Sequence, residues 1–197
     1  MVIQEQRSLQ YDHTFGIHVN TNYFVELAHE EDAVPLLASL TKDHRPLMIM
    51  GDGSNILFTG NFPGTVIRVN TKGIIIKEDD ADSITIRVSA GEVWDDVVAY
   101  CVGKGWGGIE NLSLIPGRTG AGPIHNIGAY GVELKEVFGE LEAVHIETGE
   151  KKVFSREECW FGYRNSVFQT TLRGQYLILN VTLRLSRNPV PNIEYGS

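Results

Sequence analysis

The chain has 197 residues, 42% of them hydrophobic and 21% charged, which is typical of a globular protein. This length predicts one large domain or two small ones, with no need for a disulfide framework or structural metal. The net charge is −8 without any lysine or arginine run, so nucleic acid and anionic membranes are not expected partners. No apolar run approaches the roughly 20 residues of a membrane span, and residues 1–15 have no signal-peptide core. These features predict a cytoplasmic protein.

Cysteine and histidine show no metal-binding pattern. Cys101 and Cys159 both stand beside apolar residues, which predicts reduced, structural thiols. The six histidines include no H-E-x-x-H motif and no pair four residues apart. No serine lies in a G-x-S-x-G motif, so the nucleophile of an α/β-hydrolase is also excluded.

Residues 18–70 carry alternating strand and helix signals. Apolar residues between 33 and 40 recur at helical spacing, and Asp32 stands where a capping residue is expected. The acidic run 30–32 is expected at a solvated surface. Three short aliphatic or β-branched runs predict strands: residues 23–28, 47–50 and 65–69. The predicted order is therefore β-α-β-β.

From residue 71 onward, strand signals dominate. Further strands are predicted at residues 73–77, 83–89, 140–147, 151–154 and 177–185. In the last of these, apolar residues alternate strictly with polar ones, which predicts a half-buried strand. A helix with Trp94 and Val102 on its apolar face is predicted over residues 93–102, and residues 148–150 predict a hairpin turn. The whole pattern predicts an α+β fold of two unequal parts meeting near residue 71.

The sequence Gly51-Asp52-Gly53-Ser54-Asn55 directly follows a predicted strand. Glycines let the backbone approach a ligand closely, and consecutive N–H groups can surround a phosphate. The third glycine of a dinucleotide-binding fingerprint is missing, and no amphipathic helix follows. A tight turn between strands is the alternative interpretation.

A longer glycine-rich segment covers residues 116–131. It lacks the lysine and hydroxyl residue of a P-loop, which excludes a mononucleotide kinase of that type. Pro123 can start a short helix, and backbone N–H groups in such a segment suit a pyrophosphate. The alternative is a purely structural loop, although long loops in compact domains are usually functional.

Arg164 stands between aromatic residues, in the sequence Phe161-Gly162-Tyr163-Arg164-Asn165. A guanidinium fixed in this way can bind a carboxylate or phosphate through two hydrogen bonds, or polarise an oxyanion. A surface arginine packed over an aromatic ring is the alternative.

Four motifs, in this order and spacing, resemble the UDP-N-acetylenolpyruvoylglucosamine reductase family: residues 51–55, 111–117, 126–131 and 162–166. The similarity extends over residues 20–195. It implies a two-subdomain FAD-binding fold of the vanillyl-alcohol-oxidase type. The implied subdomains are residues 1–70 and 71–187, followed by a linker, residues 188–197, toward a substrate-binding domain.

The resemblance implies FAD as the cofactor and NADPH as the hydride donor. The glycine-rich segments would hold the diphosphate and ribityl parts of FAD. The residues implied in cofactor binding are Gly51, Asp52, Gly53, Ser54, Asn55, Ile56, Ser113, Ile115, Pro116, Gly117, Thr119, Gly120, Ala121, Asn126, Gly128, Ala129, Tyr130 and Gly131.

The implied reaction reduces UDP-N-acetylglucosamine enolpyruvate to UDP-N-acetylmuramate in peptidoglycan synthesis. Arg164 is the implied catalytic residue, which would bind and polarise the enolpyruvyl carboxylate as hydride adds. Tyr163 and Tyr195 are the implied substrate-binding residues. Another FAD-linked oxidoreductase of this fold and a non-catalytic nucleotide-binding module are the competing interpretations.

Several features depart from the family pattern. Asp52 stands where glutamate or glycine is frequent, and His125, which has reach to the cofactor, stands where glutamine is common. Arg118 is a further difference. The family's catalytic serine and glutamate belong to a third domain and have no counterpart here, so the chain is expected to be a truncated FAD-binding portion without turnover of its own.

Overall fold

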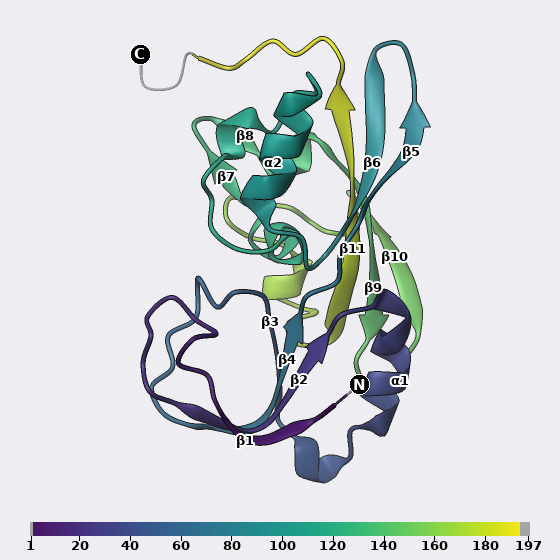
Figure 1. Ribbon diagram of the computed structural model, residues 1–197. Helices are drawn as coiled ribbons and strands as arrows, with labels where there is room; N and C mark the ends of the chain where they lie inside the picture. Colours follow the sequence, from purple (N-terminus) through teal and green to yellow (C-terminus); the bar gives the residue numbers. More distant parts are fainter. Residues whose placement is uncertain (1, 194–197) are drawn as a thin grey trace.

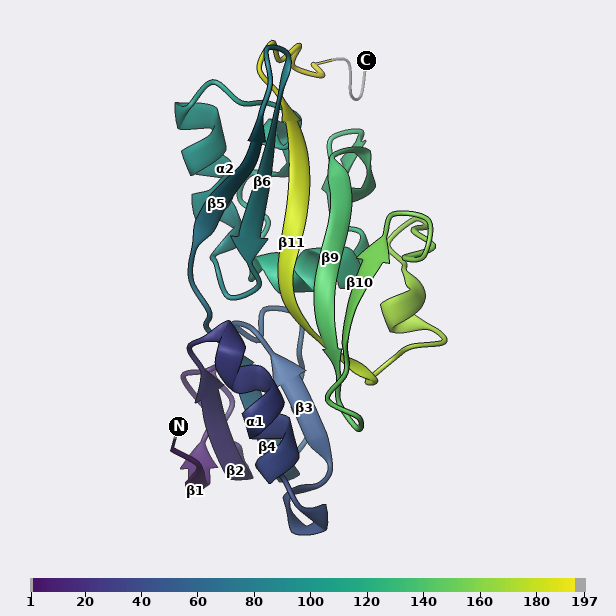
Figure 2. The same cartoon turned by 90° about the vertical axis from the view of Figure 1, so that its right-hand side faces the viewer.

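The computed structural model describes residues 2–193 and contains two main β-sheets, one above the other along the long axis of the molecule (Figure 1). The first sheet has the order β1-β2-β4-β3 and the second the order β10-β9-β11-β6-β5. Figure 2 shows α1 lying over the first sheet and α2 over the second. The α+β prediction is confirmed, whereas the boundary near residue 71 stays a prediction.

The first sheet combines three parallel strands with an antiparallel edge strand. Its strands are β1 (Gln4–Ser8), β2 (Asn20–Leu27), β3 (Leu47–Met50) and β4 (Phe62–Val69). Helix α1 (Ala33–Ser39) connects β2 to β3, so the predicted β-α-β-β order is confirmed. Strand β1 was not predicted, because its sequence is polar and charged and it lies at an exposed sheet edge. Asp32 precedes α1 but makes no side-chain capping hydrogen bond, which corrects the capping prediction.

The second sheet is entirely antiparallel. Its strands are β5 (Ile74–Asp79), β6 (Ser83–Ser89), β9 (Phe138–His145), β10 (Lys151–Ser155) and β11 (Tyr176–Ser186). Strands β9 and β10 form the predicted hairpin around residues 148–150. A separate small hairpin pairs β7 (Gly128–Ala129) with β8 (Val132–Glu133).

Helix α2 (Trp94–Gly103) covers this sheet and contributes to its core. Trp94 is buried, as predicted, and its indole N–H donates to the Leu112 carbonyl at 2.9 Å. Val102, predicted on the apolar face, is 51% exposed. The remaining helical elements are short: α3 (Gly122–His125), η1 (Glu30–Asp32), η2 (Lys42–His44), η3 (Glu110–Leu112), η4 (Thr119–Ala121), η5 (Leu134–Glu136) and η6 (Val167–Gln169).

Helix α1 packs against both parts of the chain. Its buried residues Leu36 and Leu37 share a hydrophobic cluster with Val25 of the first sheet. Val144 of β9 and Leu179 of β11 belong to the same cluster. Because both sheets bury apolar surface against one helix, this cluster holds them in a fixed relative position.

The predicted half-buried strand, β11, is buried along most of its length, which corrects that prediction. Leu177 and Leu179 pack with α1, whereas Val181 packs in the larger cluster that contains α2. The pairing of β11 with β9 has a register shift between Ile178 and Asn180. A β-bulge at such a shift reverses which side chains face each side of a sheet. The apolar residues 177, 179, 181, 183 and 185 are therefore divided between two cores.

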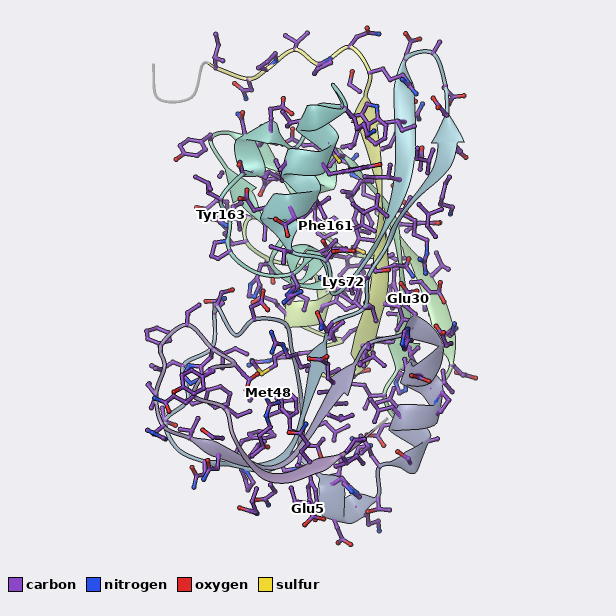
Figure 3. All side chains as sticks on the ribbon, in the orientation of Figure 1. Glu5, Glu30, Met48, Lys72, Phe161 and Tyr163 are labelled. Carbon is purple, nitrogen blue, oxygen red and sulfur yellow. The ribbon has the colours of Figure 1, made fainter. Side chains whose placement is uncertain are left out.

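Within the acidic run 30–32, Glu31 is exposed as predicted, whereas Glu30 differs from its prediction. Glu30 lies between the two parts of the chain (Figure 3), where it accepts hydrogen bonds from Arg87, from Ser89 Oγ at 2.7 Å and from Asn180 Nδ2 at 3.3 Å. These donors all belong to the second sheet. Glu30 is therefore a bridging residue and not a freely solvated one.

Candidate functional site

A cavity of about 720 Å³ lies where the two glycine-rich loops meet. The first loop, residues 51–56, follows β3, and the second, residues 115–122, precedes and enters α3. Apolar residues of β3 and β11, together with Trp94 and Phe168, form much of the remaining lining. The cavity therefore combines exposed backbone with broad apolar walls, as expected for an organic ligand that carries a polar segment.

The backbone N–H groups of residues 51–55 donate no hydrogen bond to any acceptor in the described part of the chain. Gly53 is buried and has a φ of +60°, a conformation that glycine adopts without steric cost. A Cβ atom at Gly53 would lie 2.8 Å from the Asp12 carbonyl oxygen. Residues 51–54 are buried or half-buried, and N–H groups in such positions are normally paired, so this part of the loop is prepared to donate to a ligand.

The second loop packs closely against the residues that follow β6. Gly117 has a φ of +120°, and a Cβ atom at Gly120 would lie 2.6 Å from the Ala90 Cβ atom. The N–H groups of Thr119 and Gly120 donate to the carbonyls of Glu92 and Ala90, both at 2.9 Å. This loop is thus fixed by its own backbone hydrogen bonds, and Gly120 lets it pack directly against Ala90.

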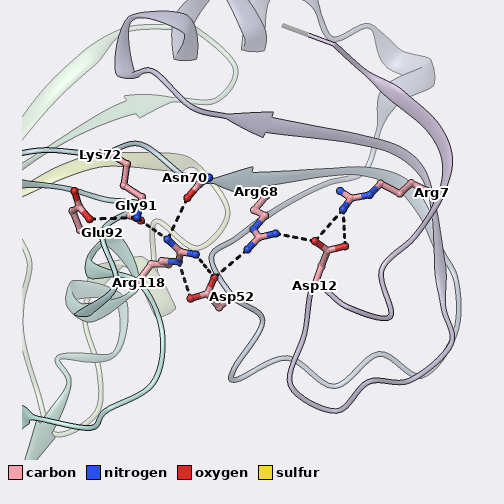
Figure 4. Close-up of polar contacts among 9 residues, drawn as sticks. All are labelled: Arg7, Asp12, Asp52, Arg68, Asn70, Lys72, Gly91, Glu92 and Arg118. Atoms are coloured by element: carbon pink, nitrogen blue, oxygen red, sulfur yellow. Dashed lines mark hydrogen bonds and ion pairs between the residues drawn. The ribbon is translucent and has the colours of Figure 1, made fainter. Parts of the chain in front are cut away.

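An alternating chain of five charged residues runs behind the first loop (Figure 4). Arg7 and Arg68 both pair with Asp12, and Arg68 also reaches Asp52 at 3.4 Å. Arg118 then holds Asp52 through two contacts, Nε to Oδ2 at 2.7 Å and Nη2 to Oδ1 at 2.6 Å. Three cations and two anions leave this group with a net charge of +1 within a chain of net charge −8. Its positive balance suits an anionic ligand.

His125 lies in the cavity wall between two side-chain amides. Its Nε2 is 3.4 Å from Asn55 Nδ2, and its Nδ1 is 2.7 Å from Gln169 Nε2. Burial, and then the nearby Arg164 guanidinium, lowers the pKa of His125 below its usual value. The imidazole is therefore neutral at pH 7 and can both donate and accept a hydrogen bond.

Arg164 occupies a tight turn at the cavity edge. Gly162 and Asn165 exchange backbone hydrogen bonds of 3.0 and 3.2 Å across this turn. Arg164 has a φ of +52°, a conformation that costs energy for a residue with a side chain. Its carbonyl accepts a hydrogen bond from Gln169 Nε2 at 3.0 Å. Its guanidinium makes no hydrogen bond or ion pair within residues 2–193, so it can receive an anionic group.

The structure brings many of the predicted site residues together in the cavity wall. Those that line it are Gly51, Asp52, Gly53, Ser54, Asn55, Ile56, Ile115, Pro116, Gly117, Gly120, Ala121 and Arg164. Predicted residues that do not line it are Ser113, Thr119, Asn126, Gly128, Ala129, Tyr130, Gly131 and Tyr163. Tyr195 lies outside the described residues.

The predicted residues outside the lining are fixed within the protein in several ways. Asn126 is fully buried, and its side chain bonds Glu133 at 3.1 Å, the Gly162 carbonyl at 2.9 Å and the Lys135 N–H at 3.0 Å. Tyr130 and Gly131 both have positive φ values in the turn between β7 and β8, as a type I′ hairpin requires. Because Asn126 donates to the Gly162 carbonyl, it holds the turn of residues 162–165 that carries Arg164.

Three more of the predicted residues lie outside the cavity lining: Ser113, Thr119 and Tyr163. Ser113 Oγ donates to Asp95 at 3.0 Å, and Thr119 Oγ1 donates to the Glu92 carbonyl at 3.2 Å. Tyr163 is 87% exposed and projects outward from the second part of the chain (Figure 3).

Sequence reasoning missed part of this site. Gln169, which contacts both His125 and Arg164, gave no signal because it lies outside the glycine-rich segments. Arg118 was noted only as a family difference, although its pairing with Asp52 has a signal, namely opposite charges in the two loops.

The two thiols are not part of the cavity. Cys101 and Cys159 are both free and buried, and burial raises the pKa of each thiol to about 12. Within residues 2–193 no cluster of three possible metal ligands occurs. No helix in that range is long and apolar enough to cross a membrane.

A family model and several known proteins are similar to this chain. The model of the FAD binding domain family matches residues 21–155. The chain is 46% identical, over its full length, to UDP-N-acetylenolpyruvoylglucosamine reductase of Amoebophilus asiaticus, and 43% identical over 98% of its length to that of Pseudomonas fluorescens. It spans only 58% and 57% of these two relatives.

Two solved structures share the fold. The UDP-N-acetylenolpyruvylglucosamine reductase of Thermus caldophilus matches with a TM-score of 0.76 and 23% identity, over 95% of this chain and 64% of that one. A cholesterol oxidase of Brevibacterium sterolicum matches with a TM-score of 0.63 and 13% identity, over 94% of this chain and 37% of that one. These matches confirm the expected FAD-binding fold of the vanillyl-alcohol-oxidase type.

Proposed function

We propose, since this chain belongs to the FAD binding domain family, that the cavity between its two sheets holds FAD. The observation that carries this proposal is that residues 51–55 all line a cavity of about 720 Å³ while their backbone N–H groups have no acceptor within residues 2–193. A diphosphate carries several acceptor oxygens and is commonly bound by such consecutive N–H groups. The net positive charge of the ion-pair chain behind the loop supports the same ligand.

The remaining lining suits the ring systems of FAD. Ile49, Trp94, Phe168, Tyr176 and Ile178 provide apolar and aromatic surface within the same cavity. Flat rings gain free energy from burial against such walls, at roughly 25 cal/mol per Å² of apolar area. Gly120 and Gly51 have no room for a side chain, because a Cβ atom at each would lie 2.6 Å from Ala90 Cβ or Arg118 Cγ, so the backbone forms the cavity wall at these two positions.

The predicted cofactor residues that do not line the cavity have supporting roles in this proposal. Asn126 positions the Arg164 turn, and Thr119 anchors the second loop to Glu92. Residues 128–131 form a hairpin beside the cavity. We further propose residues 1–70 and 71–187 as two subdomains that hold FAD between them, with residues 188–197 as a linker.

We propose reduction of the enolpyruvyl nucleotide sugar as the reaction of the complete protein. The proposal extends the names of the relatives to this chain, which spans 57–58% of their length. FAD, when bound, supplies hydride that it takes from NADPH. Arg164 would bind the substrate carboxylate through its unpaired guanidinium, with Tyr163 and Tyr195 as substrate contacts. A cytoplasmic location is part of this proposal.

The local charges favour this role for Arg164. His125 next to it is neutral at pH 7, so it does not compete with Arg164 for the substrate carboxylate. The hydrogen bonds between Gly162 and Asn165 fix the Arg164 backbone in a conformation with positive φ at the edge of the cavity. A carboxylate bound there would form two parallel charge-assisted hydrogen bonds with the guanidinium.

Equilibrium dialysis of the folded chain against FAD tests the cofactor proposal. We expect one FAD per chain, and we expect ADP to compete because it carries the adenine and the diphosphate. Far-UV circular dichroism establishes that the protein is folded in the same sample. A folded chain that takes up no FAD would contradict the proposal.

A further inference from the structure

Arg118 connects three segments at the junction of the two sheets. Besides its two contacts with Asp52, its Nη1 donates to Asn70 Oδ1 at 3.2 Å and to the Gly91 carbonyl at 2.6 Å. Asn70 directly follows β4, and Gly91 lies between β6 and α2. Figure 4 shows the Arg118 guanidinium at the centre of these contacts. One side chain of the second loop therefore holds the first loop and the crossover between the sheets.

The packing around Arg118 has little freedom. The Arg118 side chain is only 11% exposed. Its Cγ atom would lie 2.6 Å from a Cβ atom at Gly51, so its aliphatic part packs directly on the backbone of the first loop. A half-buried bidentate pair of this kind is geometrically specific, because a planar guanidinium fits a carboxylate in few orientations.

We propose that Arg118 is a positioning residue which, through Asp52, sets the spacing of the two glycine-rich loops and thereby the diphosphate-binding site. This inference rests on the proposed function. Within residues 2–193 the backbone of the first loop forms no hydrogen bond with other backbone groups, so the position of this loop depends on side-chain contacts. The Asp52 carboxylate would repel a diphosphate if it were unpaired. Its contacts with Arg118 and Arg68 neutralise its charge. They also link the first loop to the second loop and to β4.

A direct electrostatic role for Arg118 makes a different prediction. If Arg118 only contributed positive charge, then the neutral variant Asp52→Asn would bind FAD more tightly, because an anion near the diphosphate is removed. If Arg118 acts through Asp52, the same variant binds FAD more weakly, because the two loops lose their bidentate link. The sign of the Asp52→Asn effect therefore separates the two roles.

The experiment measures FAD dissociation constants for a double-mutant cycle. We expect Arg118→Met to weaken FAD binding about 10- to 100-fold and Asp52→Asn about 3- to 10-fold. The double variant is expected to equal Arg118→Met within about twofold, since both changes remove one link. Arg118→Lys keeps the charge without the planar fork and should remain weakened.

Arg87→Met is the matched control. It removes another arginine that links the two parts of the chain, through Glu30, but Arg87 does not line the FAD cavity. We expect a lower melting temperature with an unchanged FAD dissociation constant.

Each contrary outcome has one meaning. Tighter or unchanged binding by Asp52→Asn, additive effects in the double variant, or full rescue by Arg118→Lys would overturn the positioning role while FAD binding itself stands. If Arg118→Met does not fold, Asp52→Asn and Arg118→Lys decide the question. A wild-type chain that binds no FAD would overturn the proposed function, and with it this inference.

Discussion

The 51–55 loop and the hairpin at residues 128–131 are both small, glycine-containing segments beside the same site, yet they differ in how their backbones are satisfied. The hairpin pairs with its own strands, Gly128 with Glu133 and Ala129 with Val132. The loop leaves five consecutive N–H groups without an acceptor within residues 2–193. Composition alone does not separate the two, but unpaired donors do. The loop is available to a ligand, whereas the hairpin shapes the surface around it.

The largest expected effect comes from adding a side chain at Gly53 in the 51–55 loop. Gly53→Ala places a Cβ atom 2.8 Å from the Asp12 carbonyl oxygen at a φ of +60°. The loop must then move, so we expect FAD binding to weaken about 100-fold, which is roughly 2.7 kcal/mol. Fluorescence titration of FAD measures this change.

Gly60→Ala is the matched control for that variant, because a Cβ atom at Gly60 meets nothing within 4 Å. Its FAD affinity should equal that of the wild type. Unchanged binding by Gly53→Ala would show that the loop does not hold the ligand.

The next largest effect is expected for Asn126, which supports the turn that carries Arg164. Asn126→Ala removes hydrogen bonds to Glu133, the Gly162 carbonyl and the Lys135 N–H from a fully buried position. We expect the free energy of unfolding to fall by about 2 to 4 kcal/mol, because buried partners are left unpaired. Urea denaturation of the FAD-free chain measures it.

Asn22→Ala controls for the loss of an asparagine, since its side chain has one long hydrogen bond of 3.4 Å with Gln6. It should cost less than about 0.5 kcal/mol. Equal destabilisation by the two variants would contradict a special role for Asn126.

The smallest effect concerns pH. His125 has a lowered pKa in the folded state, so between that pKa and 6.5 the unfolded chain binds more protons than the folded one. Stability therefore falls as the pH drops below about 6.5. The variant His125→Gln replaces the imidazole with an amide, which does not titrate, so it should lose about 2 °C less in melting temperature than the wild type between pH 7.5 and 5. Equal losses of melting temperature by both proteins between pH 7.5 and 5 would exclude this contribution of His125.

The sequence predicted most of the architecture, because the apolar periodicity that defines a strand or helix is local. It did not predict β1, since Gln4–Ser8 has no apolar pattern and forms a strand only by pairing with β2. It also did not predict the bulge near Ile178, which sends the alternating residues of β11 into two different cores. That feature depends on pairing with β9, which lies far away in the sequence.

The site was predicted to a similar extent. The glycine-rich motifs identified both loops of the cavity, because unusual backbone geometry requires particular residues. They did not distinguish residues that face the cavity from those that support it, such as Asn126, whose side chain is buried against Glu133. The link between Asp52 and Arg118 joins positions 66 residues apart and becomes visible only when the chain is folded.

Residue-resolved amide hydrogen exchange, with and without FAD, tests the central claim most directly. We expect FAD to slow exchange at residues 51–55, whose N–H groups have no acceptor within residues 2–193, and to leave Gly128 and Ala129 nearly unchanged. Saturating FAD that slows exchange elsewhere but not at residues 51–55 would contradict the claim that this loop binds the diphosphate.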